Sequence, residues 1–190
     1  MHRRSFIAAA ATTLGVALLP RISTAVQLGE VRFDDDLNTP SARLKLVGTG
    51  LFYYRSFIKI AAAGLYLDEQ ADSVDVLGDV AKRLEMQYFR NVKSQHLVAG
   101  STALLARNLS AERRAELAPQ IEAMHALYRD VKSGDRCALM YLPGAGTSLQ
   151  GNGNTLGTVP GADFAAAYFS IWFGERPMDA RLKKRLLGLS

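Results

Sequence analysis

The chain has 190 residues, of which 48% are hydrophobic and 22% charged, so it can form one domain of ordinary size with an apolar core. This balance excludes a chain that is disordered throughout. Taking Arg3, Arg4 and Arg21 from the 23 basic residues leaves 20 against 18 acidic residues, and such a small charge predicts no nucleic-acid partner.

The amino terminus has the three parts of an export signal. His2-Arg3-Arg4 is basic, residues 6–19 are mostly apolar, and Ser23-Thr24-Ala25 are small residues of the kind that a signal peptidase reads. The apolar stretch is short for a helix that must cross a bilayer core of about 30 Å. We therefore predict a signal peptide over residues 1–25, cleavage near Ala25, and a domain over 26–190. The mature protein is expected in the periplasm or outside the cell, without a stable membrane anchor.

The export route is left open by these residues. Arg3-Arg4-Ser5-Phe6-Ile7 resembles the twin-arginine signal, which exports folded proteins. A general secretory signal that happens to begin with two arginines is the alternative. Replacing both arginines with lysines separates the two routes.

The first part of the mature chain is predicted to be mostly extended. A possible strand over residues 30–33 leads into an acidic turn that lacks the ligand spacing of a calcium loop. Extended runs follow over 42–53 and 57–67, and Gly48 and Gly50 indicate a bulge or a close approach in the first of them. We expect a short helix over 74–80 and an alternating strand over 83–89.

The middle of the chain is predicted to be helical. A first helix covers 93–109, Ser110 can cap the next segment, and Pro119 kinks or restarts it. Apolar residues then recur at helical spacing and predict a stripe that faces the core: Leu117, Ile121, Met124, Tyr128 and Val131. His96 and His125 lie in these helices and are interpreted as packing or surface residues.

The last third is predicted to return to strands before two closing helices. A strand over 136–142 contains Cys137, the only cysteine, which excludes an internal disulfide and is expected to be buried. Strands over 146–150 and 155–159 flank Gly151-Asn152-Gly153-Asn154, a strong hairpin signal. Helices follow over 162–173 and 179–187. Strands, then helices, then a hairpin and helices predict an α+β fold with an antiparallel sheet.

Three stretches taken together resemble the chalcone isomerase-like family. They are Phe57–Ile60 running into Ala63–Leu67, Arg83–Phe89, and Tyr141–Thr147 leading through Asn152 to Phe164 and to Ile171–Pro177. Their order and spacing cover nearly all of residues 40–188. The resemblance implies an open-faced β-sandwich, with a large antiparallel sheet, a layer of helices on one face, and a cleft between the two.

The resemblance also implies site positions, and this sequence departs from them. Plant enzymes of the family close a chalcone to a flavanone with an arginine, a threonine and a tyrosine, and non-catalytic relatives bind fatty acids with the arginine and the tyrosine. Here the arginine position falls at Thr49 and the threonine position at Ala61, and the tyrosine position falls within 102–105, where there is no tyrosine. A site without these charged and hydroxyl donors should lose most of its rate enhancement.

These departures favour a non-catalytic protein that binds a lipid-like or other apolar small molecule, such as a fatty acid or an aromatic compound. An isomerase, or intramolecular lyase, with a non-standard catalytic set is the alternative. No cofactor and no metal site are predicted, and haem is the least favoured cargo because no haem motif surrounds His96 or His125. The candidate ligand-binding residues are Thr49, Tyr54, Arg55, Ile58, Ile60, Leu104, Leu105 and Phe164. Strand alternation places Arg55 and Tyr54 on different faces of the sheet. Arg55 therefore either points at an anionic ligand or faces water on the outer side of the sheet.

Overall fold

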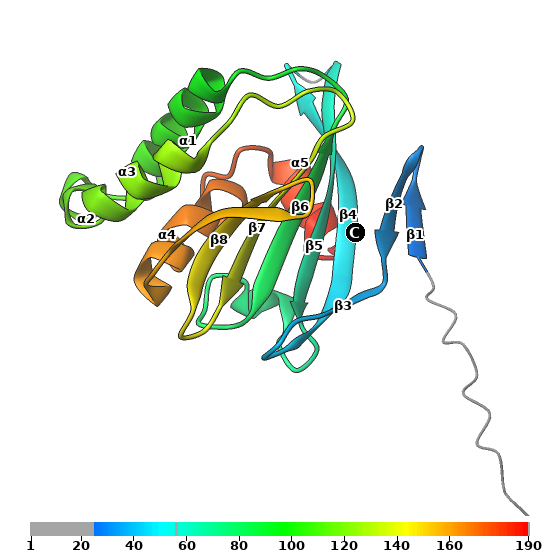
Figure 1. Ribbon diagram of the computed structural model, residues 1–190, viewed down its shortest axis with the longest axis horizontal. Helices are drawn as coiled ribbons and strands as arrows, with labels where there is room; N and C mark the ends of the chain where they lie inside the picture. Colours follow the sequence, from blue (N-terminus) through cyan, green and yellow to red (C-terminus); the bar gives the residue numbers. More distant parts are fainter. Residues whose placement is uncertain (1–24, 56, 190) are drawn as a thin grey trace, which may run out of the picture.

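The structure is a computed structural model that describes residues 25–55 and 57–189. Within them, seven antiparallel strands form one sheet in which each strand pairs with the next along the chain (Figure 1). These strands are β3 (Asp36–Asn38), β4 (Arg43–Tyr54), β5 (Ile58–Asp68), β6 (Lys82–Tyr88), β7 (Arg136–Leu142), β8 (Gly146–Gly151) and β9 (Asn154–Val159). The predicted signal peptide lies, apart from Ala25, outside the described residues.

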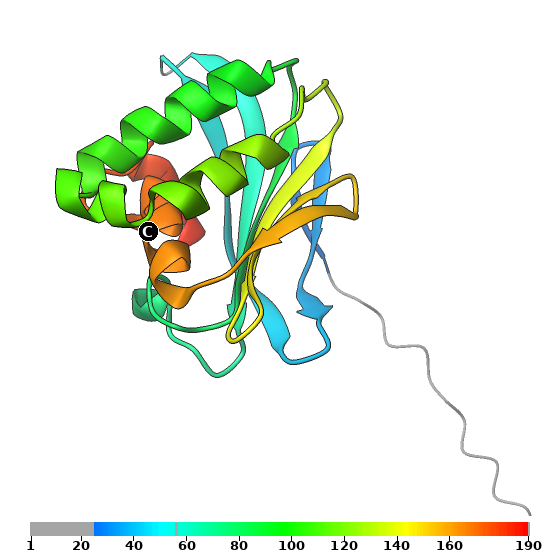
Figure 2. The ribbon, with the colours of Figure 1, turned by 60° about the vertical axis from the view of Figure 1, so that its left-hand side comes forward.

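The helices lie together on one face of the curled sheet, as Figures 1 and 2 show. They are α1 (Ser94–Asn108), α2 (Ala111–Glu116), α3 (Ala118–Leu127), α4 (Ala162–Phe173) and α5 (Ala180–Leu186). Helix α4 is the innermost of them, because most of its residues are buried and it carries almost no charge. This arrangement confirms the predicted α+β open-faced sandwich. No helix in the described residues is long and apolar enough to cross a membrane.

A two-stranded hairpin covers the opposite face of the sheet. It consists of β1 (Ala25–Leu28) and β2 (Val31–Asp34), where the sequence indicates only a single strand. Val31 and Phe33 alternate into a second core and are 1% and 0% exposed. A Cβ on Gly64 would lie 2.8 Å from the Phe33 ring, so that glycine is what lets the hairpin approach strand β5.

Local signals locate several element boundaries well. Strand β7 and helix α4 have the predicted bounds, and the Ser110 hydroxyl caps α2 by accepting from the Arg113 amide at 3.1 Å. The turn between β8 and β9 has positive φ at Asn152 (47°) and Gly153 (83°), as a tight hairpin requires. The expected helix over 74–80 is wrong: only a 3₁₀ turn at Ser73–Asp75 forms, and the chain turns again where the Gly78 amide donates to the Asp75 carbonyl at 2.7 Å.

Gly48 and Gly50 serve both purposes that the sequence suggests. The register of β4 against β5 shifts between Leu46 and Gly48, which marks a bulge. Helix α5 then packs directly on this strand: a Cβ on Gly48 would lie 2.2 Å from the Arg185 carbonyl oxygen. Gly48 therefore lets the backbones of strand β4 and helix α5 touch, and Gly50 leaves room for the Leu182 and Arg185 side chains of that helix.

Candidate functional site

A cavity of about 690 Å³ lies between the sheet and the helical layer. Strands β4–β6 form one wall, and helices α1 and α4 form the other. The wall is mostly apolar and is made by Phe52, Tyr54, Ile60, Met86, Tyr88, Asn91, Val92, His96, Leu97, Ala99, Gly100, Ser101, Leu104, Tyr128, Ile171, Trp172 and Met178. His96, Asn91 and Tyr54 are exposed and mark the mouth, whereas Met86, Tyr88 and Ile171 are buried inside. Its size and composition are those of a small-molecule site.

A bulge in the β4–β5 hairpin shapes the sheet wall. The register shifts between Phe52 and Tyr53, so that Phe52 pairs with Ala61 while Tyr53 pairs with Lys59. Ile60 is the extra residue, and both Ile60 and Ala61 consequently belong to the core on the helical side. Ile60 lines the cavity beside Phe52, and the neighbouring Ala61 is completely buried.

Two hydrogen-bonded pairs link the cavity wall to the helices behind it. The Ser101 hydroxyl lies 2.9 Å from His125 Nε2, and the Tyr128 hydroxyl lies 2.9 Å from the Tyr168 hydroxyl. The His125 ring packs against both tyrosines, with centroids 6.2 Å and 6.3 Å away. Ser101 and Tyr128 line the cavity, so these pairs give the apolar wall a small polar spot joined to α1, α3 and α4.

Burial around this polar spot disfavours charge of either sign. It raises the pKa of Tyr128 to about 12, and it also raises the pKa of Tyr88 and the pKa of Tyr168. Burial also lowers the pKa of the His125 imidazole. Acids are thus kept protonated and the base is kept neutral, which is the mark of a poorly solvated environment.

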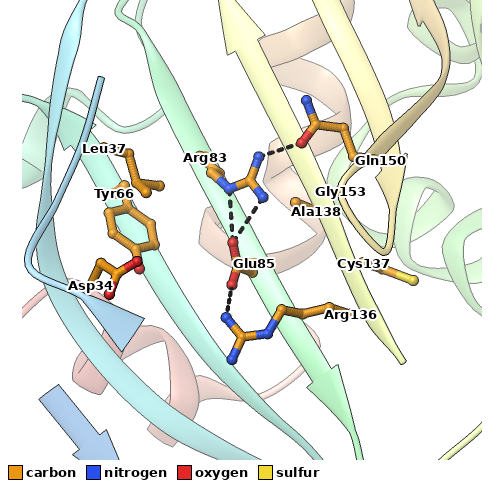
Figure 3. A pocket seen from close by; sticks show the side chains of 10 residues that line it. All are labelled: Asp34, Leu37, Tyr66, Arg83, Glu85, Arg136, Cys137, Ala138, Gln150 and Gly153. Carbon is orange, nitrogen blue, oxygen red and sulfur yellow. Dashed lines mark hydrogen bonds and ion pairs between the residues drawn. The ribbon is translucent and has the colours of Figure 1, made fainter. Parts of the chain in front are cut away.

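The opposite face of the sheet carries a second, smaller cavity of about 170 Å³ with a different chemistry (Figure 3). Glu85 lies between two guanidinium groups: Arg83 donates to one carboxylate oxygen at 2.8 and 3.0 Å, and Arg136 donates to the other at 2.5 Å. Arg83 also donates to the Gln150 side chain, and Arg136 donates to the Arg32 carbonyl at 2.9 Å. Burial, together with the Glu85 carboxylate, raises the pKa of Tyr66 beside them.

This charged cluster has a structural role and is not the candidate ligand site. Both guanidinium groups are already paired with the Glu85 carboxylate, and Arg136 connects strand β7 to the backbone of the β1–β2 hairpin. The Arg136 guanidinium also lies over the Phe33 ring, 5.6 Å from its centroid. The small volume left beside these groups makes the cavity on the helical side the candidate functional site.

Comparison with protein families matches residues 25–188 to the chalcone isomerase-like model. The chain belongs to the chalcone isomerase-like family. Among solved structures it is similar to a fatty-acid binding protein from Arabidopsis thaliana, with a TM-score of 0.65 and 16% sequence identity over 87% of this chain and 96% of that one. At this identity the likeness shows the fold alone. A comparison with curated proteins found no significant match.

Thr49 and Ala61, the positions to which the resemblance assigns the family's arginine and threonine, lie outside the cavity lining. Gly48 and Gly50 face α5, so Thr49 between them points to the other face of the sheet. Ala61 is on the helical side but is completely buried in the core. In this family member neither position presents a polar group to the cavity.

The predicted ligand-binding residues are divided by the structure. Tyr54, Ile60 and Leu104 line the cavity, and five others do not: Thr49, Arg55, Ile58, Leu105 and Phe164. Leu105 and Phe164 are buried in the core. Leu105 follows the cavity residue Leu104, and one step along a helix turns the side chain by about 100°, which is enough to direct Leu105 away from the cavity. Ile58 is half-buried and pairs with Tyr54 at the tip of the hairpin. Arg55 is exposed, with its guanidinium 5.4 Å from the centre of the Tyr54 ring.

Sequence reasoning misses the polar spot of the cavity. It interprets His125 as a packing or surface residue and Tyr128 as one member of an apolar stripe. His125 lies in the last turn of α3 and Tyr128 directly follows the helix, so their spacing of three residues is a usable signal of proximity, but their partners Ser101 and Tyr168 come from α1 and α4. Trp172 also goes unnoticed as a wall residue, although its segment carries part of the family resemblance.

Proposed function

We propose that this protein binds an apolar, lipid-like or aromatic small molecule in the cavity between sheet and helices, without catalysing a reaction. The observation that carries the proposal is the cavity itself: about 690 Å³, with a wall that is mainly aliphatic and aromatic. One solved structure to which the fold is similar is a fatty-acid binding protein, which agrees with ligand binding by this architecture.

The geometry of Ser101 and His125 favours binding over catalysis. Ser101 Oγ lies 3.0 Å from the Val98 carbonyl oxygen and 2.9 Å from His125 Nε2, so its one proton has two competing acceptors. Among the described residues no carboxylate is hydrogen-bonded to His125, so the third group that would orient the imidazole as a base is absent from the pair. The pair links α1 to α3 without the complete set of a nucleophile, its base and an orienting acid.

Filling the cavity is expected to abolish binding. Leu104 is half-buried on the cavity side of α1, and the Leu104→Trp substitution would place a bulky ring where the ligand lies. We expect the affinity for a C12–C16 lipid, measured by calorimetry on the purified protein, to fall at least about tenfold, or about 1.4 kcal/mol. The matched control is Ala103→Trp, because Ala103 is exposed on the same helix and does not line the cavity.

Equal losses of lipid affinity in the two tryptophan variants would show that the loss comes from a disturbed helix α1 and not from a filled cavity. Mass spectrometry of small molecules that co-purify with the wild-type protein would identify natural ligands directly. If no lipid or aromatic compound binds more tightly than about 1 mM, a gain of only about 4 kcal/mol, the proposal is wrong.

If the protein were instead an isomerase, it would convert a chalcone in this cavity. With Thr49 turned away and Ala61 buried, neither position can supply a donor to a developing enolate in the cavity. We expect no saturable, protein-dependent loss of chalcone absorbance in a spectrophotometric assay above the spontaneous rate. Turnover that saturates with substrate and disappears in Leu104→Trp would establish an isomerase in this cavity.

We also propose that the protein is exported and works after cleavage near Ala25. Support comes from the basic start, apolar stretch and small residues of the first 25 positions. Cleavage there would leave the β1–β2 hairpin almost whole, because β1 begins at Ala25. Amino-terminal sequencing of the protein recovered from the periplasm should begin near Val26, and an intact amino terminus in the exported protein would contradict this.

A further inference from the structure

We propose that the ligand of this cavity enters with an uncharged polar end, such as a hydroxyl or carbonyl group, and that the cavity rejects the same chain when it ends in an ion. This inference rests on the proposed binding function and specifies the ligand class. It follows from what the wall contains, from how its polar groups are already engaged, and from how those groups are solvated.

The wall offers no fixed charge to a ligand. Among the described residues that line the cavity there is no Lys, Arg, Asp or Glu. The imidazole of His96 is the one basic side chain among these lining residues, and it is exposed at the mouth. A carboxylate or an ammonium group drawn inside would lose its hydration without gaining a counter-ion, which is strongly unfavourable.

The polar groups inside suit a neutral oxygen instead. Ser101 and Tyr128 line the cavity, and the hydroxyl of each is held by a hydrogen bond at 2.9 Å to a residue behind the wall. The indole Nε1 of Trp172, another wall residue, is buried without a hydrogen-bond partner in the described part of the chain and is not exposed to the open cavity. A hydroxyl can donate or accept, so the two hydroxyl-bearing residues match an alcohol or a carbonyl.

The solvation of the protein's own groups supports the same conclusion. Burial raises the pKa of Tyr88, Tyr128 and Tyr168, and it lowers the pKa of His125. A ligand carboxylate placed among these groups would meet the same poorly solvated surroundings and would be disfavoured in its ionised form.

The test compares three ligands with the same C12 chain at pH 7.5: dodecan-1-ol, dodecanoate and dodecylammonium. Trp172 is the only tryptophan of the chain and lines the cavity, so its fluorescence reports occupancy without a label. We expect saturable binding of the alcohol, and affinities at least about tenfold lower for both ions. An anion that binds as tightly as the alcohol overturns the inference but leaves the binding function intact. If none of the three binds, and aromatic compounds also fail, the proposed function itself is wrong.

A charge placed in the wall should reverse the preference. In Leu104→Arg a guanidinium would enter the cavity from α1, and dodecanoate should then bind at least about tenfold better than it does to the wild type. The control is Ala103→Arg, which adds the same charge on the exposed side of the helix and should leave all three affinities unchanged. Equal gains in both variants would mean that the anion binds outside the cavity. The wild-type comparison stands by itself if Leu104→Arg does not fold.

Discussion

Replacing Glu85 with alanine is expected to destabilise the protein by about 3–5 kcal/mol, because the change leaves two guanidinium groups facing each other without the carboxylate between them. Glu85 is only 6% exposed and holds Arg83 and Arg136 on its two oxygens (Figure 3). Urea denaturation followed by circular dichroism would measure the loss. The effect should be local in origin, beginning with release of the β1–β2 hairpin from the sheet.

An exposed ion pair provides the control for this change. Glu116 pairs with Arg113 on the surface at 2.7 Å, and Glu116→Ala should shift the denaturation midpoint little. Hydrogen exchange would test the local origin, since the amides of β1 and β2 should lose protection first in Glu85→Ala. A loss no larger in Glu85→Ala than in Glu116→Ala would show that the buried cluster does not fasten the hairpin.

The second large effect concerns a buried lysine. Lys82 is 0% exposed, lies between the rings of Tyr141 and Phe169, and donates to the Gly78 carbonyl at 2.5 Å. Burial lowers its pKa from 10.5 to about 8, against the smaller opposing effect of Asp79. Keeping the charge at pH 7 therefore costs the folded state about 3 kcal/mol. Lys82→Met keeps much of the length without the charge and should raise the free energy of unfolding at pH 7 by about 1–3 kcal/mol.

The same lysine predicts a pH dependence. Between pH 8 and 10.5 the folded protein has lost the Lys82 proton while the unfolded chain still holds it, so stability rises with pH in this window. Cys137 acts in the opposite direction from about pH 9, because burial raises its pKa to about 11 and the unfolded thiol ionises first. The buried tyrosines oppose the rise in the same way above pH 10. The effect of Lys82 is therefore best measured between pH 7 and pH 9, where the free energy of unfolding of the wild type should rise by on the order of 1 kcal/mol.

The measurement is a pair of urea denaturation series at pH 7, 8 and 9, one for the wild type and one for Lys82→Met. The rise should be present in the wild type and absent from the variant, since all other titrating groups are shared. A rise of equal size in both proteins would assign it to another group. A variant that is less stable than the wild type at pH 7 would show that the hydrogen bond to Gly78 outweighs the cost of the buried charge.

Features that depend on neighbouring residues along the chain could be predicted from the sequence alone. The apolar runs of β7 and α4, the Ser110 cap and the Asn152-Gly153 turn each act within a few residues, so the order of amino acids is enough to locate them. The family resemblance supplied the order of the layers, which the structure confirms. The cavity between sheet and helices followed from that resemblance, together with three of its wall residues: Tyr54, Ile60 and Leu104.

Which side chains meet depends on how the strands and helices pack in three dimensions. The bulge in the β4–β5 hairpin puts both Ile60 and Ala61 on the helical side, and such a register shift depends on the pairing of two strands. Ser101, His125, Tyr128 and Tyr168 come together from three helices and a loop, and Arg83, Glu85 and Arg136 from neighbouring strands. The contacts that join different elements, such as Ser101 with His125, Tyr128 with Tyr168 and Glu85 with Arg136, are between residues 24 or more apart in sequence, and propensity and periodicity carry no information about them. The absence of fixed charge from the described cavity wall became visible only when strand register and helix packing assigned each side chain to a face.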